Sequence, residues 1–220
     1  MSAETAAIIV AAGRGERMAG ADKLWAPVAG RPLLAHTIAA FEACGAIDRV
    51  VLVVAKENLE RGRELAGAFA TVRDVVAGGA TRQESVRAGL DALDDAAWVV
   101  VHDGARPLVT PDLIERGFEA ARETGAACCA LPAPDTVKEA NEAGAIARTL
   151  DRSRLWLAQT PQVVRYDLLV EAHRRAEGLA TDDAALVEAL GVEVRLYEGS
   201  PRNLKVTTPD DLAIAEALLR

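Results

Sequence analysis

Hydrophobic and polar positions along this chain predict strands and helices in alternation. Apolar runs, which suit strands buried on both faces of a sheet, occur at 6–12, 49–55, 98–101 and 126–131, and a short strand is predicted at 71–76. Apolar residues recur instead at helical spacing over 32–44, 57–66 and 81–93, and a further helix begins at Thr110-Pro111. Alternation of this kind predicts an α/β fold: a doubly wound, mostly parallel sheet of Rossmann-like type.

The alternation breaks at Pro132. Short alternating segments at 136–138 and 145–150 flank the turn residues 141–144, which predicts a β-hairpin. We expect this hairpin to form an arm over about 132–157, inserted into a single domain that spans 1–220. Because a long hairpin is marginally stable alone, the arm is expected to pack on a partner, most simply a second copy of the chain.

After the arm the chain returns to α/β character. The pattern predicts helices over 166–176 and 182–190, and strands at 192–197 and 204–207. A last helix begins at Thr208, which is followed by proline and two acids. The string Thr181-Asp182-Asp183 is interpreted as a helix cap.

Polar residues gather directly after several predicted strands. Gly13-Arg14-Gly15-Glu16-Arg17 follows the first strand, Gly78-Gly79 follows the strand that ends at Val76, and Asp103-Gly104-Ala105-Arg106 follows the strand from Trp98. Ligands of such sheets bind beyond the carboxyl ends of the strands, so these groups are expected to converge. Backbone N–H groups of a Gly-rich turn, with Arg14, Arg17 and Lys23 close by, indicate a polyanion such as a nucleoside triphosphate.

Two common phosphate-binding motifs do not match this loop. A P-loop requires Lys and then Ser or Thr after its second glycine, whereas Gly15 is followed by Glu16-Arg17-Met18. Met18 also occupies the third glycine position of the dinucleotide fingerprint, which argues against a dehydrogenase. From the loop alone, a tight turn with solvated arginines remains an equal alternative.

Composition narrows the range of partners. The chain has 220 residues and a formal net charge of −8, which argues against binding a nucleic-acid polymer but not against small phosphates. No apolar run reaches membrane-spanning length, and the N-terminus lacks the features of a signal peptide. The three cysteines have neither zinc nor redox spacing, so they are expected to be buried thiols in the reducing cytoplasm. The sequence contains no cluster of His and Cys residues that would indicate a metal site.

Several polar residues have two interpretations at this stage. Asp103 could bind Mg²⁺ or a hydroxyl, or could simply pair with Arg106. Ser85 could hydrogen-bond the edge of a base, or could lie on a solvated helical face. His102 is expected to point away from the cleft and is not assigned as a base, because neighbouring strand residues alternate.

Lysine usage points to two of the cations. Only four of the 25 basic residues are lysines, and an ammonium can follow one phosphoryl oxygen through a reaction. Lys23 and Lys205 stand beside the motifs, whereas Lys56 and Lys138 are interpreted as surface residues.

Taken together, the strings resemble the cytidylyltransferase family that acts on 2-C-methyl-D-erythritol 4-phosphate in non-mevalonate isoprenoid synthesis. The matching strings occur in the same order as in the family, and together they cover nearly the whole chain. The matching strings are Ala11-Ala12-Gly13-Arg14-Gly15-Glu16-Arg17-Met18, Lys23, Gly78-Gly79 with Arg82, Ser85 and Val86, Val101-His102-Asp103-Gly104-Ala105-Arg106-Pro107, Asp135-Thr136-Val137-Lys138, Gln159-Thr160-Pro161-Gln162, Thr181-Asp182-Asp183 and Asn203-Leu204-Lys205-Val206-Thr207. The Asp-x-Ala-Arg-Pro, Thr-Pro-Gln and Lys-Val-Thr strings are the most specific of these.

The resemblance implies Mg²⁺-dependent transfer of CMP from CTP to the substrate phosphate. It implies that Arg17 and Lys23 stabilise the charge of the transition state, and that Arg152 and Lys205 position the incoming phosphate. The residues implied to surround the nucleotide are Ala11, Ala12, Gly13, Gly79 and Ser85, and those implied to line the shared site are Asp103, Ala105 and Arg106. Thr136 and Thr160 are implied to help bind the sugar phosphate, and no protein ligand is assigned to the metal.

The resemblance also implies a homodimer whose arm crosses to the neighbouring subunit, so that Arg152 and Thr136 complete the partner's site. A cytidylyltransferase for another polyol phosphate, such as ribitol 5-phosphate, is an alternative of the same class. A non-catalytic nucleotide-binding protein is the alternative from another class, against which the intact basic residues count.

Overall fold

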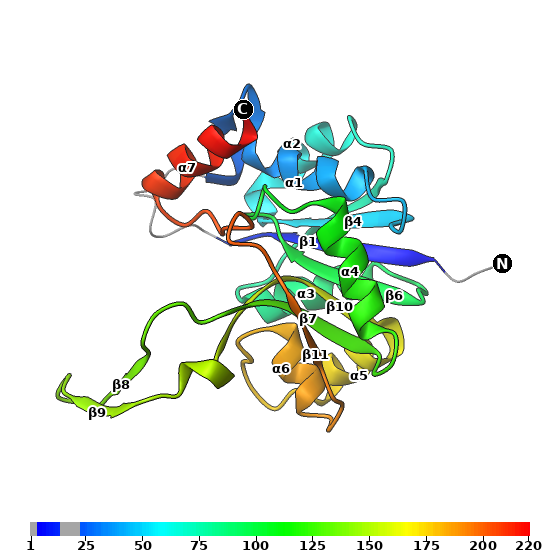
Figure 1. Cartoon of the computed structure of the whole chain (residues 1–220). Helices are drawn as coiled ribbons and strands as arrows, with labels where there is room; N and C mark the ends of the chain where they lie inside the picture. The colour runs from blue at the N-terminus through cyan, green and yellow to red at the C-terminus, as the bar shows by residue number, and fades with distance from the viewer. Residues whose placement is uncertain (1–3, 14–22) are drawn as a thin grey trace.

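One central sheet organises the molecule. The computed structural model describes residues 4–13 and 23–220. Within these residues seven strands form a sheet in the order β11-β7-β10-β6-β1-β4-β5 (Figure 1). The strands are β1 (Thr5–Ala11), β4 (Arg49–Val54), β5 (Val72–Ala77), β6 (Trp98–Asp103), β7 (Ala126–Pro132), β10 (Trp156–Arg165) and β11 (Arg195–Glu198). The mostly parallel α/β architecture predicted from the sequence is confirmed.

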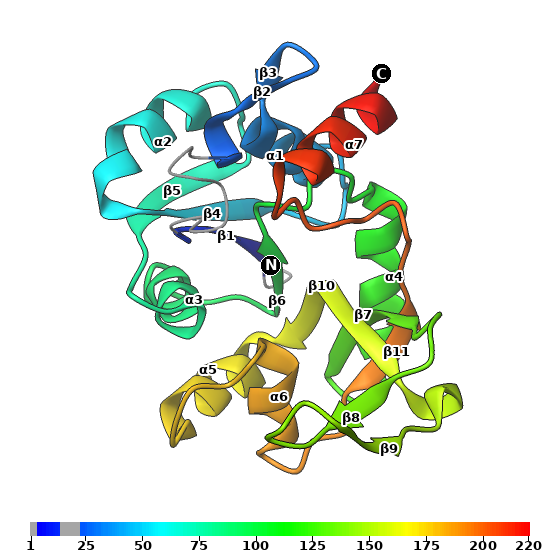
Figure 2. The same cartoon turned by 90° about the vertical axis from the view of Figure 1, so that its left-hand side faces the viewer.

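Helices cover both faces of this sheet (Figures 1 and 2). The helices are α1 (Leu33–Glu42), α2 (Leu59–Ala66), α3 (Arg82–Asp91), α4 (Pro111–Ala121), α5 (Tyr166–Arg175), α6 (Asp183–Glu188) and α7 (Pro209–Leu219). One hydrophobic cluster includes Leu34 and Phe41 of α1, and a second includes Val86 of α3 and Leu169 of α5. The sheet therefore separates two cores. Among the described residues, no helix has the length and apolar character needed to cross a membrane.

The middle of the sheet follows the predicted pattern closely. β1 pairs in parallel with both neighbours, so that Ile8 lies opposite Val51 of β4 and Val101 of β6. Ile9 and Leu52 enter the other core, because successive side chains of a strand point to opposite faces. Apart from residues at their ends, these strands are apolar because both of their faces are covered.

Strand β10 is not among the predicted strands. It runs antiparallel between β6 and β7, so it is an interior strand of the sheet and not an edge strand. Polar residues and Pro161 within this segment argue against a central strand. The register of β10 against β7 shifts between Ala158 and Gln162, so Pro161 lies where the ladder is already interrupted.

The strand predicted at 204–207 is absent. Leu204, Lys205, Val206 and Thr207 form an extended loop, and the N–H of Val206 donates to the carbonyl of Ala105 at 2.8 Å. This loop pairs with the loop that follows β6 and not with a strand, which is why its apolar alternation was misleading. The remaining short elements are β2 (Pro27–Val28), β3 (Arg31–Pro32), and 3-10 turns at Lys23–Trp25, Lys56–Asn58 and Arg152–Arg154.

The predicted hairpin is present between β7 and β10. Its strands are β8 (Lys138–Ala140) and β9 (Ile146–Thr149), and they pair antiparallel around a turn in which Gly144 has a φ of +78°. Figure 1 shows this hairpin reaching away from the sheet as an arm. At its base, the N–H of Ala133 donates to the carbonyl of Leu155 at 2.9 Å.

Candidate functional site

A cavity of about 720 Å³ lies beyond the carboxyl ends of β1, β4, β5 and β6. The predicted site residues in its lining are Ala11, Ala12, Gly13, Lys23, Gly79, Ser85, Asp103, Ala105 and Lys205. The predicted convergence of loops at this edge of the sheet is therefore observed. Lys56, which was interpreted as a surface residue, is exposed and also borders the cavity.

Two loops approach each other closely on one side of this cavity. A Cβ atom added to Gly78 would lie 2.4 Å from the Cβ of Ala12 and 2.7 Å from the Oγ of Ser85. Only glycine allows the loop after β5 to lie this close to the loop after β1. The buried Ser85 hydroxyl donates to the carbonyl of Thr81 at 2.8 Å, so it does not lie on a solvated face.

Helix α3 follows the second of these loops, the one after β5, and begins with a capping box. The Oγ1 of Thr81 accepts the N–H of Glu84 at 3.1 Å, and the carboxylate of Glu84 accepts the N–H groups of Ala80 and Thr81 at 2.6 and 3.1 Å. These bonds fix the direction in which the helix leaves the loop. They thereby hold Arg82, the next residue, in the lining of the cavity.

Asp103, at the end of β6, is the centre of a group of cations. Its Oδ2 lies 2.8 Å from the Nζ of Lys205, and its Oδ1 accepts the Nε–H of Arg82 at 3.1 Å. The Nε of Arg106 is 3.8 Å from Oδ2. Burial raises the pKa of this carboxyl, but the three cations outweigh burial and hold the pKa well below its usual range. Asp103 is therefore a permanent carboxylate that orients Lys205 and Arg82.

The loop that carries Lys205 is anchored by β10 and by the loop after β6. The Nδ2 of Asn203 donates to the carbonyl of Thr160 at 2.8 Å, and the Nη1 of Arg106 donates to the carbonyl of Asn203 at 2.8 Å. Gln159 adds a bond from its Nε2 to the carbonyl of Ser200 at 3.1 Å. The Gln-Thr-Pro-Gln string thus supports the position of Lys205.

Thr160 lies behind Asp103 and not in the lining of the cavity. Its Oγ1 accepts the backbone N–H of Asp103 at 3.0 Å and lies 3.1 Å from the Nδ1 of His102. His102 is fully buried against Phe41, with ring centroids 5.1 Å apart. Burial lowers the pKa of His102 to about 3, so the imidazole is neutral at physiological pH. His102 does point away from the cavity, as predicted.

Two predicted residues lie on the arm and not in this cavity. Thr136 and Arg152 are exposed, and Arg152 donates from its Nη1 to the carbonyl of Pro134. Neither residue lines the cavity of its own chain. Arg17, like Arg14, lies outside the described residues.

Two polar residues were not assigned a role from the sequence. Arg82 appeared only within a resembling string, and Asp183 was interpreted as part of a helix cap. The Nη1 of Arg82 donates to the Oδ2 of Asp183 at 2.6 Å, and Asp183 is 1% exposed. The available signal was a second acid beside Asp182, because Asp182 alone caps the helix through the N–H of Ala185.

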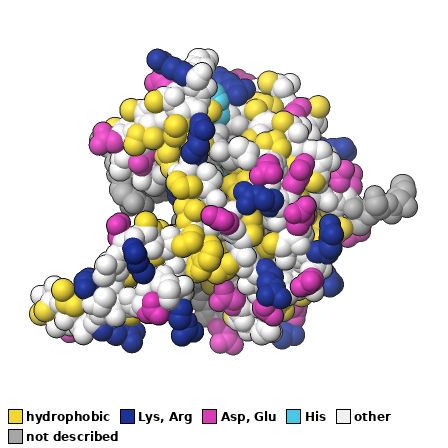
Figure 3. All heavy atoms as spheres, in the orientation of Figure 1, with side chains coloured by type: hydrophobic (Ala, Val, Ile, Leu, Met, Phe, Trp, Pro, Cys, Tyr) yellow, Lys and Arg dark blue, Asp and Glu magenta, His cyan; other side chains and the backbone are white. Residues whose placement is uncertain are grey.

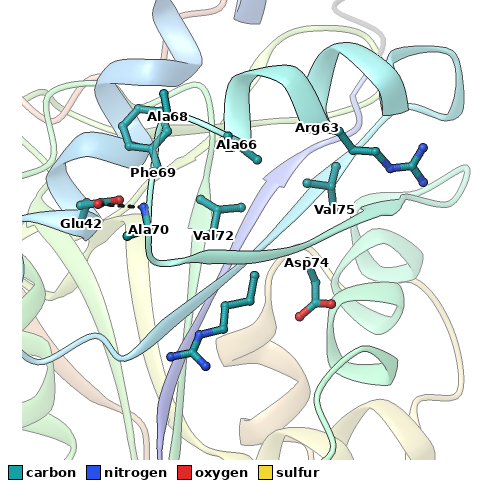
Figure 4. Close-up of a pocket in the computed structure, with 11 residues that line it drawn as sticks. Glu42, Arg63, Ala66, Ala68, Phe69, Ala70, Val72, Asp74 and Val75 are labelled. Atoms are coloured by element: carbon teal, nitrogen blue, oxygen red, sulfur yellow. Dashed lines mark hydrogen bonds between the residues drawn. The ribbon is translucent and has the colours of Figure 1, made fainter.

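A second hollow, of about 680 Å³, lies between α2 and the edge strand β5 (Figure 4). Two of its charged side chains are already paired, because Glu42 accepts the N–H of Ala70 at 3.0 Å and Arg63 pairs with Glu60. In the described residues, no group of three or more His, Cys, Asp or Glu side chains could hold a metal ion. The first cavity is therefore the better candidate for chemistry.

Charged side chains on the face shown in Figure 3 are of both signs and intermixed, rather than gathered into a basic area. Hydrophobic side chains gather near the root of the arm on this face. Trp156 and Leu157, at the start of β10, are 39% and 51% exposed.

Comparison with known proteins identifies the family. The model of the family described as 2-C-methyl-D-erythritol 4-phosphate cytidylyltransferase matches residues 5–220. A protein of that name from Dehalococcoides mccartyi (strain CBDB1) is 46% identical over 222 residues, which cover 100% of this chain and 98% of the relative. One from Bacillus velezensis is 46% identical over 99% of this chain and 96% of its own length.

Solved structures agree with the sequence relatives. 4-Diphosphocytidyl-2C-methyl-D-erythritol synthase from Anaerococcus prevotii superposes with a TM-score of 0.88 at 29% identity, covering 99% of this chain and 96% of that chain. 2-C-methyl-D-erythritol 4-phosphate cytidylyltransferase from Thermus thermophilus superposes with a TM-score of 0.78 at 39% identity, covering 99% and 98%.

Proposed function

This chain belongs to the 2-C-methyl-D-erythritol 4-phosphate cytidylyltransferase family, and we propose from that premise how its residues carry the reaction. The enzyme transfers CMP from CTP to the phosphate of 2-C-methyl-D-erythritol 4-phosphate. The products are 4-diphosphocytidyl-2-C-methyl-D-erythritol and pyrophosphate. The observation that carries this function is the full-length family match, on a chain whose cavity gathers Lys23, Asp103 and Lys205.

The reaction exchanges one phosphoanhydride bond for another. An oxygen of the substrate phosphate attacks the α-phosphorus of CTP, and the bond from that phosphorus to the bridging oxygen of pyrophosphate breaks. The attacking phosphate is already ionised, so the step requires no general base. Catalysis then rests on alignment of the two phosphates and on stabilisation of their charge.

The basic residues divide between the two substrates. Lys23, in the lining, and Arg17, outside the described residues, stabilise the charge of the triphosphate in the transition state. Lys205 holds the incoming phosphate in line, together with Arg152. Support comes from the Lys205 side chain, which is 42% exposed in the lining although it is paired with Asp103.

The nucleotide lies against the two loops that approach at Gly78. Ala11, Ala12 and Gly13 face it from the end of β1 and the loop that follows, and Gly79 and Ser85 face it from the loop before α3 and from that helix. Asp103, Ala105 and Arg106 lie at the junction of the two substrates. Thr160 supports sugar-phosphate binding through the backbone of Asp103, to which it is bonded.

We propose that Mg²⁺ enters with CTP. The described residues suit an ion that takes most of its ligands from phosphate oxygens and water, because Asp103 and Glu57 are the acids in the lining. No side chain is assigned as its ligand, because Asp103 is already paired with Lys205 and Arg82. When bound, the ion neutralises phosphate charge and favours departure of pyrophosphate.

The active form is proposed to be a homodimer formed through the arm. Thr136 and Arg152 lie away from the cavity of their own chain, and the arm carries exposed apolar side chains, with Ile146 65% exposed. A partner that covers this surface would receive Arg152 and Thr136 at its own cavity. The three buried free thiols are consistent with a protein of the cytoplasm, which we propose as its compartment.

Pyrophosphate release tests the function. The protein is given CTP, UTP or ATP with Mg²⁺, and either methylerythritol phosphate or ribitol 5-phosphate. Release only with CTP and methylerythritol phosphate is expected. Preference for ribitol 5-phosphate would retain the mechanism and replace the substrate, whereas no release with any pair would indicate a binding protein.

A further inference from the structure

A line of ion pairs leads from the cavity into the interior of the protein. Arg82 donates from Nε to Asp103 at 3.1 Å and from Nη1 to Asp183 at 2.6 Å. The Nε2 of His173 lies 3.0 Å from the other carboxylate oxygen of Asp183. Arg82 and Asp103 line the cavity, whereas Asp183 and His173 do not. Asp183 therefore reaches the site only through Arg82.

Capping of α6 does not explain why the carboxylate of Asp183 is buried. Asp182 already caps α6, and the amide oxygen of Gln162 accepts the N–H groups of Asp183 and Ala184 at 3.1 and 3.0 Å. The start of the helix is thus satisfied without the carboxylate of Asp183. A buried carboxylate without a partner is strongly destabilising, so its position makes sense only together with Arg82 and His173.

Two partners fix an arginine more firmly than one. The guanidinium of Arg82 is planar, and its Nε and Nη1 are directed at two different carboxylates, so its rotation is constrained. With Asp103 alone, this long side chain would be able to turn toward an anion in the cavity. Contact with Asp183 keeps Arg82 on Asp103.

We propose that Asp183 is a positioning residue for the transfer reaction, holding Arg82 against Asp103 so that Asp103 presents Lys205 to the incoming phosphate. The proposal rests on the role of Lys205 given under Proposed function. When the ammonium of Lys205 turns to the phosphate, Asp103 loses its partner at 2.8 Å. Arg82 then still neutralises Asp103, so no unpaired carboxylate remains beside two phosphates.

Asp182 provides a matched control for this proposal. It lies at the same helix start and carries the same charge, and its side chain bonds to Gln162 and Ala185 rather than to Arg82. Asp182→Asn and Asp183→Asn each remove one negative charge from the start of α6. Asparagine is also a good N-cap, so the control preserves the helix.

The experiment measures steady-state kinetics and CTP binding for both variants. In Asp183→Asn, kcat/KM for methylerythritol phosphate should fall by about 10- to 100-fold, as misplacement of a reacting group commonly does. Calorimetry should give a CTP dissociation constant within about threefold of the wild type, because Lys23 and the two glycine loops are untouched. Asp182→Asn should retain kcat/KM.

Equal losses in the two variants, or a parallel loss of CTP affinity in Asp183→Asn, would show a role in holding the helix and overturn positioning. A second comparison repeats Asp183→Asn in an Arg82→Met background, where no further loss in kcat/KM is expected. An independent, multiplying loss there would also overturn the proposal.

Arg82→Lys covers the case in which Asp183→Asn does not fold. It keeps the charge but lacks the fork that joins the two carboxylates, and the same selective loss is expected. Unchanged kcat/KM in Arg82→Lys would contradict the proposal. If the wild-type protein releases pyrophosphate and the variants are equally active, the positioning role of Asp183 is wrong but the proposed reaction stands. An inactive wild type contradicts the proposed reaction and the inference with it.

Discussion

The Nζ of Lys205 lies 2.8 Å from the Oδ2 of Asp103, in the lining of the cavity. The two side chains differ in exposure, since Lys205 is 42% exposed and Asp103 only 10%. The lysine can therefore exchange its carboxylate partner for a phosphate oxygen without leaving the site, while Asp103 keeps Arg82. This asymmetry makes Lys205 the mobile member of the pair.

Loss of a cation from this site should reduce turnover strongly. Lys205→Ala, Lys23→Ala and Arg17→Ala are each expected to lower kcat by on the order of 10²–10³, because a preorganised charge that stabilises the reacting phosphates is lost. Arg87→Ala is the control, since Arg87 is 53% exposed and, among the described residues, pairs with Asp91 on α3 alone. Steady-state pyrophosphate release measures all four variants. Equal effects in the control and the other three would contradict the assignment of these residues.

Close approach at Gly78 should be required for CTP binding. In Gly78→Ala the new Cβ would lie 2.4 Å from the Cβ of Ala12, which has no flexible side chain to move. The two loops must then separate, and CTP affinity should fall by about tenfold or more in calorimetry.

Gly45→Ala serves as the control for Gly78→Ala, because an added Cβ at Gly45 meets nothing within 4 Å. If Gly78→Ala binds CTP as tightly as this control does, the nucleotide does not lie against these loops.

Mixed dimers should separate a contribution in trans from one in cis. If Arg152 acts on the partner's cavity, a dimer of one Lys23→Ala subunit and one Arg152→Ala subunit has one intact site. Random pairing of the two inactive variants should then restore about a quarter of wild-type turnover, because half of the dimers are mixed. Co-expression with two affinity tags allows the mixed dimer to be isolated and assayed. A mixed dimer as inactive as its parents would place Arg152 in its own chain's site.

Stability should depend on His102 in mildly acid solution. Burial lowers the pKa of His102 from 6.5 to about 3, so between these values the unfolded chain binds a proton that the folded protein does not. The free energy of unfolding should therefore fall as the pH falls through this window, by up to about 1.4 kcal/mol per pH unit from this residue. Urea unfolding of wild type and His102→Asn should show a flatter dependence in the variant below pH ~6. Above pH ~7.5 the two dependences should coincide, and identical slopes at all pH values would refute the assignment.

Three of the strands that were predicted correctly share one property. Apart from residues at their ends, β1, β4 and β6 are apolar because both of their faces are buried, so local composition is enough to identify them. β10 contains Pro161 and polar side chains whose partners are distant, and its strand character comes from β6 and β7 on either side. The opposite error at 204–207 has the same origin, because that segment bonds to a loop. In both segments, the secondary structure depends on the neighbouring segments to which the backbone is hydrogen-bonded, and not on local composition.

The candidate site shows the same division. Glycine loops and charges after successive strands predicted a common edge, since that convergence follows from parallel topology. The contact between Arg82 and Asp183 joins α3 to the start of α6, and nothing in either local sequence indicates the other. Likewise the placing of Thr160 behind Asp103 depends on β10 lying beside β6, which the sequence did not reveal.

The arm leaves the sheet and returns to it between neighbouring strands, with Ala133 and Leu155 joined by a hydrogen bond of 2.9 Å. A short turn could connect these two residues directly, and the order of the strands would be unchanged. The fold of the arm is thus independent of the strand order that builds the nucleotide cavity. Substitutions in the arm outside Thr136 and Arg152 can therefore accumulate while the loops that line the nucleotide cavity stay unchanged.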